Sequence, residues 1–344
     1  MTGTKIVKLR LDDGAGDKLP RLKDDDINLD SVVELFEKLE YTTAHEAGSY
    51  HRGVLDATKD LNVSPPKLQA LLETIAEKHG GETNYRDQAG LFLTALIENS
   101  RHREFVIKPG KHLSYLGYRL SGGKKIVVEG NVGYNTGQEM KGGTVIVEGH
   151  AFVSTGEKME AGTIIIKGDV QGHTGAEMRG GCIEVGGNAT DASTGRRMEG
   201  GSILVRGHTS KWTGSHMKGG TITVEGDAGP NTGEGMEGGV ITVGKDTGWY
   251  TGYQMKDGKI IVNGNATDYL GRNMEGGTIE VRLDAGGDVG WSMKGGTIKV
   301  GRNAGRDLGA FMEAGTIDVA GKIEKISSLY ESGTILQAGN KVRG

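Results

Sequence analysis

The chain has little cysteine and proline, and its hydrophobic residues never form a long run. Cys182 is the single cysteine among 344 residues, which excludes a disulfide framework and a cysteine-rich zinc site. No stretch reaches the roughly 18 consecutive apolar residues of a membrane-spanning helix, and residues 1–20 carry charges throughout instead of a signal-peptide core. These absences lead us to expect a cytoplasmic protein that does not interact with membranes.

An excess of positive charge is also lacking. The 41 basic and 45 acidic residues leave a formal net charge of -4, so the charge balance does not indicate a nucleic-acid partner. Glycine is abundant instead, with 61 residues concentrated after residue 120. A strict Gly-X-Y period is absent, which excludes a collagen-like chain.

The methionines reveal an internal repeat. Apart from Met1, they recur every 19 residues, with one spacing of 20, and a glycine stands three residues before and three residues after each of them. Degenerate copies with Leu120 and Tyr330 in the methionine position flank the series. A short exact repeat with altered ends predicts a solenoid with terminal caps. The methionines of the series are Met140, Met159, Met178, Met198, Met217, Met236, Met255, Met274, Met293 and Met312.

Each repeat contains a strand after its second glycine. TVIVEG, TIIIKG, SILVRG and TITVEG alternate β-branched with variable residues, a period typical of a strand with one buried face. Nineteen residues cannot hold a strand, a helix and two loops. We therefore predict a right-handed parallel β-helix of about 12 turns over residues 106–344. The methionines and inward strand residues would form core columns, and the glycines would occupy corners that need positive φ or close backbone approach.

Three further columns have the same period. The residue after each methionine alternates in charge, which predicts a ladder that fixes the register, because a slip of one turn would place like charges over each other. The threonines at the fourth position before the methionine, from Thr136 to Thr251, are interpreted as a hydroxyl ladder. His150 and His208 share a position with Asn and Asp residues, which favours a backbone role at a corner over a metal site. The charged column is Lys141, Glu160, Arg179, Glu199, Lys218, Glu237, Lys256, Glu275, Lys294 and Glu313.

Residues 1–105 are predicted to form a small α-helical domain. SVVELFEKLE follows Asp30 as a potential N-cap, and Ser64-Pro65-Pro66 introduces the helical pattern KLQALLETIAEKHGG. Another helix is expected over DQAGLFLTALIENS and a weaker one around HRGVLDATKDL. This domain could cap the open end of the solenoid or serve as a docking module, and the sequence favours neither.

Aromatic residues, only 5% of the chain, gather in one part of the repeat. They lie two to six residues before their methionines, so stacking would place them on one edge as an exposed patch for a protein partner. Packing beneath a corner would explain the same pattern. No acid–base pair, nucleophile or ligand cluster stands out, so we predict no catalytic, cofactor-binding or metal-binding residue. The predicted partner-binding residues are Trp212, Trp249, Tyr250, Tyr253, Tyr269 and Trp291.

Repeats such as GAEMRGGCIEVGG and GRNMEGGTIEVRLDAG resemble those of a known β-helix family. The family includes the β-helix subunit of formylmethanofuran dehydrogenase and the C-terminal GXGXG domain of glutamate synthase, and the resemblance covers about residues 113–335. In this family the β-helix is structural, and other subunits or domains perform the chemistry. The resemblance therefore implies a scaffold within an oxidoreductase complex, without catalytic residues or cofactors of its own.

Three functions remain open. The first is a scaffold in a one-carbon enzyme complex, whose partner subunits would carry molybdenum or tungsten. The second is the β-helix subunit of a glutamate-synthase-like complex of an amidotransferase and an FMN-containing synthase with iron–sulfur clusters. The third is a structural solenoid that assembles with itself as a homo-oligomer.

Overall fold

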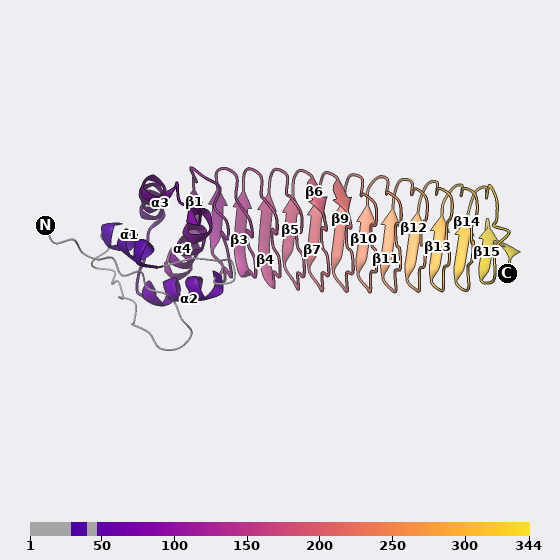
Figure 1. Ribbon diagram of the computed structural model, residues 1–344, viewed down its shortest axis with the longest axis horizontal. Helices are drawn as coiled ribbons and strands as arrows, with labels where there is room; N and C mark the ends of the chain where they lie inside the picture. The colour runs from indigo at the N-terminus through magenta and orange to yellow at the C-terminus, as the bar shows by residue number, and fades with distance from the viewer. Residues whose placement is uncertain (1–28, 40–46) are drawn as a thin grey trace.

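The chain folds as a parallel β-solenoid with helices at its N-terminal end (Figure 1). The computed structural model describes residues 29–39 and 47–344. Within this part of the chain, one sheet of 14 strands runs in the order β1-β2-β3-β4-β5-β7-β9-β10-β11-β12-β13-β14-β15-β16, and β6 pairs separately with β8. Every neighbouring pair in the large sheet is parallel except β15 and β16, which confirms the predicted fold class.

The helices and strands have the following bounds. The helices are α1 (Leu29–Lys38), α2 (Ala47–Ala57), α3 (Pro65–His79) and α4 (Tyr85–Asn99). The strands are β1 (Glu104–Ile107), β2 (Lys125–Val128), β3 (Lys141–Val147), β4 (Ala161–Ile166), β5 (Cys182–Val185), β6 (Ala189–Ala192), β7 (Ser202–Val205), β8 (Thr209–Lys211), β9 (Thr221–Val224), β10 (Val240–Val243), β11 (Lys259–Val262), β12 (Thr278–Val281), β13 (Thr297–Val300), β14 (Thr316–Val319), β15 (Thr334–Gln337) and β16 (Asn340–Arg343).

The sheet stacks identical residues on one another. Ile241 of β10 pairs with Ile222 of β9 and with Ile260 of β11, and the inward valines follow the same register. These isoleucines and valines are almost fully buried, as are the methionines of the repeat. Successive turns therefore bury the same apolar side chains in columns, which removes their surface from water at every step.

The Gly-x-x-Met-x-x-Gly phrase has a steric explanation. Gly214 has a φ of +66°, and a Cβ there would lie 2.3 Å from Cδ1 of Ile241 in the next turn. Gly239, in the other glycine column, has a φ of +84°, and its Cβ would lie 2.7 Å from the terminal methyl of Met217. Each glycine thus provides a left-handed backbone and space for an apolar side chain of an adjacent turn.

The threonine column is buried, but its hydroxyl groups do not form a ladder between turns. Thr232 donates to the carbonyl of Gly229 at 2.8 Å, and Thr251 donates to the carbonyl of Gly248 at 3.0 Å. Each of these bonds stays within one turn and closes a tight bend. The expectation of a hydroxyl ladder was therefore wrong, because the hydroxyl group reaches the carbonyl three residues earlier in its own turn.

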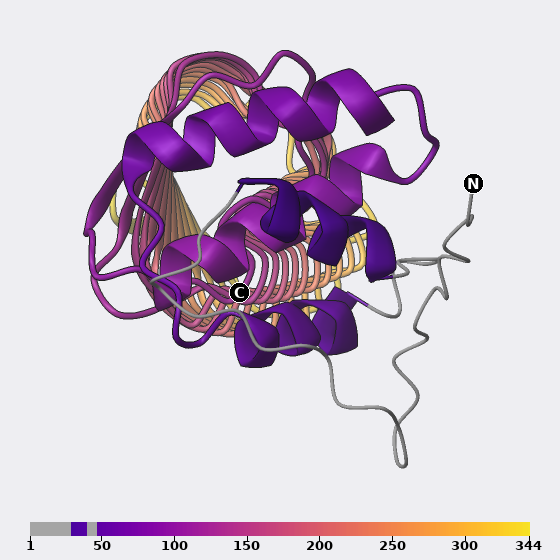
Figure 2. The same ribbon diagram turned by 90° about the vertical axis from the view of Figure 1, so that its left-hand side faces the viewer.

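Helix α4 covers the first turn of the solenoid (Figure 2). Its Thr94 hydroxyl accepts the N–H of Gly117 at 3.0 Å, and its Glu98 carboxylate accepts the N–H of Ser121 at 3.1 Å. The buried side chains of the helices and of the solenoid form one continuous cluster. The helices therefore cap the end of the stack, because they supply acceptors to N–H groups that have no preceding turn to bond.

Two details at this end concern single residues. Asp30 lies in the first turn of α1 and is not the residue that precedes the helix, so the prediction that it is the N-cap was wrong.

His51 of α2 is buried, with Nδ1 3.3 Å from the carbonyl oxygen of Leu91 and its ring against Tyr118. Burial lowers the pKa of His51 to about 4, because the charged imidazolium would lose its hydration.

The C-terminal end of the sheet is covered by the chain itself. Strand β16 folds back antiparallel on β15, and its four residues are exposed. Arg343 of this strand lies 5.3 Å from the ring centre of Tyr330, the residue in the degenerate methionine position. A short strand with charged residues protects the sheet edge against pairing with another chain.

Candidate partner-binding surface

Every turn makes a tight bend in the residues that precede its methionine. In the turn of Met255, φ is +61° at Tyr250, +71° at Gly252 and +53° at Gln254, so every second residue has a left-handed backbone. The same positions have positive φ in all ten methionine-containing turns, a count made on residues that the structure describes. A left-handed conformation costs a non-glycine residue roughly 1–2 kcal/mol.

Hydrogen bonds between turns hold this bend. Tyr250 donates its N–H to the carbonyl of Asp268 in the next turn, and Gly252 donates to the carbonyl of Thr232 in the previous turn. The pairing alternates up and down along the bend as it does in a parallel sheet. Side chains at equivalent positions of successive bends are therefore stacked in columns.

Aromatic rings occupy these columns before Met255, Met274, Met293 and Met312. Tyr250 and Tyr269 are nearly parallel, with ring centres 5.0 Å apart and planes inclined by 10°. Trp291 lies 6.4 Å from Tyr269 and 5.3 Å from Phe311, and Tyr253 lies 5.8 Å from Tyr250. We name this cluster the aromatic corner. Its members are the contacting rings of Tyr250, Tyr253, Tyr269, Trp291 and Phe311, together with Trp249, which directly precedes Tyr250 in the chain.

The exposed member of the aromatic corner is Trp249. Its side chain is 58% exposed, whereas the other members are partly buried. Trp212 does not join the corner: its ring lies beneath the ammonium group of Lys211, 4.4 Å from the ring centre, and the bend between Trp212 and Tyr250 carries Asn231 instead. The structure thus brings the rings of four of the six predicted residues into contact, namely Tyr250, Tyr253, Tyr269 and Trp291, and leaves Trp249 exposed next to Tyr250 in the chain.

Two residues of this surface were missed. Phe311 stands directly before Met312, and it could have been found by extending the aromatic pattern by one position. Arg272 lies over three rings, with its guanidinium carbon 5.3 Å from the centre of Tyr269, 5.6 Å from Trp291 and 5.8 Å from Tyr250. The cation stabilises the ring stack through its attraction to the ring faces.

Three carboxylates border the aromatic corner. Asp288 and Asp307 occupy the column of Tyr250 and Tyr269 in the next two turns, and Asp268 is close enough to interact electrostatically with Asp288. Burial, followed by the charges of Asp307 and Asp268, raises the pKa of Asp288, whereas Arg272 opposes this shift. Among the described residues, Asp288 and Asp307 have neither a hydrogen bond nor an ion pair through their carboxylates.

A second part of the surface carries charges that alternate in sign. In the predicted column, Glu199 lies 3.5 Å from Arg179 and 3.6 Å from Lys218, and Glu237 lies 3.0 Å from Lys256. These ion pairs between successive turns support the interpretation that the charge ladder fixes the register of the repeats. Exposed pairs add little stability, and their main effect is to disfavour a one-turn slip.

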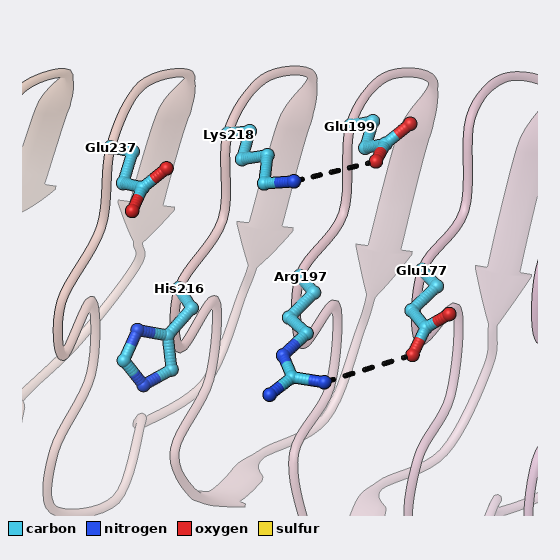
Figure 3. Close-up of a pocket in the computed structure, with 6 residues that line it drawn as sticks. All are labelled: Glu177, Arg197, Glu199, His216, Lys218 and Glu237. Carbon is cyan, nitrogen blue, oxygen red and sulfur yellow. Dashed lines mark ion pairs between the residues drawn. The ribbon is translucent and has the colours of Figure 1, made fainter.

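A parallel charge column, one residue before the methionine, was not predicted. Arg119 pairs with Glu139 at 2.7 Å, and Glu177 lies 4.0 Å from both Lys158 and Arg197. The two columns line a shallow depression of about 400 Å³ (Figure 3). From the turn of Met140 to that of Met198 the columns alternate with opposite phase, so cations and anions are neighbours across the columns as well as along them. The residues that line the depression are Glu177, Arg197, Glu199, His216, Lys218 and Glu237.

Side chains in the column that contains His150 and His208 accept hydrogen bonds from backbone N–H groups. Nδ1 of His208 accepts the N–H of Asp227 at 3.0 Å, and Oδ1 of Asp227 in turn accepts the N–H of Asp246 at 3.0 Å. His150 accepts the N–H of Asp169 in the same way at 2.9 Å. Each side chain at this corner thus binds the backbone of the following turn, which agrees with the role predicted for these residue types.

Neither metal-binding nor membrane-spanning features are found in the described ranges. No group of three or more His, Cys, Asp or Glu side chains there could hold a metal ion. None of the helices is both long and apolar enough to cross a bilayer. In comparisons with known proteins, no family model matches the chain, and no curated protein matches it significantly.

Proposed function

We propose that this chain is a non-catalytic scaffold that binds a protein partner through the aromatic corner. The observation that carries the proposal is the stack of Tyr250, Tyr269, Trp291 and Phe311 beside an exposed Trp249. Tryptophan, tyrosine and arginine are the residues that most often dominate the binding energy of protein interfaces. Here they are fixed on a rigid repeat, so little conformational entropy is lost when a partner covers them.

The sequence resemblance suggests which assembly the scaffold serves. We propose a role like that of the β-helix subunit of formylmethanofuran dehydrogenase, in a cytoplasmic one-carbon enzyme complex whose partner subunits hold molybdenum or tungsten. The alternative is a glutamate-synthase-like complex, whose partners would hold FMN and iron–sulfur clusters. The chemistry of the co-purified partner distinguishes the two.

Assembly of the chain with itself, end to end, has less support. Helix α4 covers the first turn, and the charged strand β16 covers the last strand of the sheet. Both ends of the solenoid are therefore protected against stacking with another copy. A partner has better access to the lateral surface, where the aromatic corner lies.

The test is purification of the tagged full-length chain from its native cells, with mass spectrometry of bound proteins and measurement of metal and flavin. The double variant Trp249→Ser/Trp291→Ser should lose the partner by roughly thirtyfold or more in affinity, equivalent to about 2 kcal/mol. Trp212→Ser is the matched control, because Trp212 lies outside the corner. Equal partner recovery with both variants, or turnover by the isolated chain, would contradict the proposal.

A further inference from the structure

The acidic side chains beside the aromatic corner do not alternate in sign with basic ones, unlike the charges in the two columns next to the methionines. Asp288 and Asp307 occupy the same column on successive turns, whose backbones lie about 4.8 Å apart. Like charges at that spacing repel each other. In the two alternating columns the sequence avoids this arrangement, as in the series Arg179, Glu199 and Lys218.

The backbone does not require these charges. Their column has positive φ, which asparagine and aspartate tolerate better than most residues. Asparagine already fills the same position at Asn135 and Asn231. It would meet the backbone requirement at Asp288 and Asp307 without electrostatic repulsion.

Hydrogen bonding does not explain them either. Asp227 and Asp246 also lie on successive turns, but each carboxylate accepts the N–H of the following turn. Asp268 likewise accepts the N–H of Gly287 at 2.8 Å. The carboxylates of Asp288 and Asp307 have no such donor among the residues described.

The neighbouring aromatic rings, like the carboxylates, attract a cation. Trp291 is in the bend of Asp288, and Phe311 is in the bend of Asp307, with their ring centres 5.3 Å apart. Aromatic faces attract cations, and they do so most strongly where water is partly excluded. The internal cation Arg272 lies over the rings of Tyr250, Tyr269 and Trp291 and does not form an ion pair with either carboxylate.

We propose that the acidic end of the aromatic corner, formed by Asp268, Asp288 and Asp307 with Trp291 and Phe311, receives an arginine or lysine side chain of the protein partner. The inference rests on the proposed function, because it specifies the chemistry of the partner segment that docks there. The carboxylates provide charge complementarity and the rings provide contact area. The repulsion between the acids in the free chain is relieved when the partner's cation enters.

The experiment compares two fluorescein-labelled peptides by fluorescence anisotropy on the full-length chain. One alternates arginine with glycine, and the other replaces arginine with citrulline, which has a similar shape without the charge. We expect the arginine peptide to bind roughly tenfold more tightly, with an affinity that falls as salt is added. Equal binding of the two peptides overturns the inference.

The deciding variant is Asp288→Asn/Asp307→Asn, with Asp227→Asn/Asp246→Asn as the matched control of equal charge change. The first should lose roughly tenfold in affinity for the arginine peptide while its urea unfolding midpoint stays the same or increases. The control should keep the affinity of the parent. A lower unfolding midpoint for Asp288→Asn/Asp307→Asn would show that the two carboxylates have a structural role. If calcium chloride stabilises the parent but not this variant, the carboxylates bind a metal ion. Each of these outcomes overturns the inference.

Failure of the inference can be separated from failure of the proposed function. If Trp249→Ser/Trp291→Ser abolishes binding of the native partner and Asp288→Asn/Asp307→Asn does not affect it, the aromatic corner binds a partner without a basic side chain at its acidic end. If neither double variant affects that binding, both proposals are wrong.

Discussion

Replacing Gly214 by alanine tests the packing of the glycine column most directly. The substituted Cβ would lie 2.3 Å from Cδ1 of Ile241, and φ at this position is +66°. A left-handed alanine costs roughly 1–2 kcal/mol, and forcing a methyl group into a packed core costs roughly 1–3 kcal/mol. We therefore expect the free energy of unfolding to fall by about 2–5 kcal/mol.

A double-mutant cycle separates the two contributions. Ile241→Val removes the methyl group that would clash, at a cost of about 0.5–1.5 kcal/mol by itself. In that background Gly214→Ala should cost only about 1–2 kcal/mol, because the backbone term remains and the steric term is relieved. Urea denaturation followed by far-ultraviolet circular dichroism provides the free energies.

The control is Gly110→Ala. Gly110 is outside the left-handed region, and a Cβ there would meet no atom within 4 Å. Its substitution should change stability by less than about 0.5 kcal/mol. If the losses in unfolding free energy caused by Gly214→Ala and Ile241→Val are strictly additive, the steric argument is wrong. If Gly214→Ala leaves the unfolding free energy unchanged, the explanation of the glycine column as a whole is wrong.

Three further predictions use the same denaturation assay. Met217→Ala should cost about 2–5 kcal/mol by leaving a cavity, whereas Met217→Leu should cost less than about 1.5 kcal/mol; similar losses would argue against a packed methionine column. Glu199→Lys places a cation between Arg179 and Lys218, and its loss of about 1 kcal/mol should disappear in roughly 1 M salt; a loss that persists in salt would show another role. For His51, the folded pKa of about 4 lies below the ordinary value of 6.5, so the unfolded chain binds the proton first. The free energy of unfolding should therefore fall by about 3 kcal/mol as the pH decreases from about 6.5 to about 4, and a parent whose pH dependence equals that of His51→Gln would contradict the buried neutral histidine.

Part of the aromatic corner could be predicted from the sequence, because the constant period of the repeat determines which residues are stacked in a column. Once Met255, Met274 and Met293 are aligned, the residues at equal distances before them must lie above one another. Five residues of the aromatic corner follow from this alignment. Phe311 follows from it too, once phenylalanine is considered together with tryptophan and tyrosine.

Relations between different columns could not be derived in this way. The alignment alone does not place Arg272 over Tyr269 or Asp268 beside Asp288, since these residues stand at different positions of the repeat. Their proximity depends on how the bend turns the backbone at every second residue. Residue types offered little indication of that bend, because tyrosine and tryptophan rarely adopt positive φ.

The sequence by itself determined the repeat, the strand register and the buried columns, because a one-residue shift would expose every isoleucine and valine of a strand. Only the tertiary structure decided how the ends are closed. Thr94 and Glu98 meet the backbone of the first turn although α4 lies outside the repeat, and no periodicity relates the two. Tertiary packing also decided which acids and rings share the aromatic corner, since contacts across columns depend on backbone direction and not on spacing along the chain.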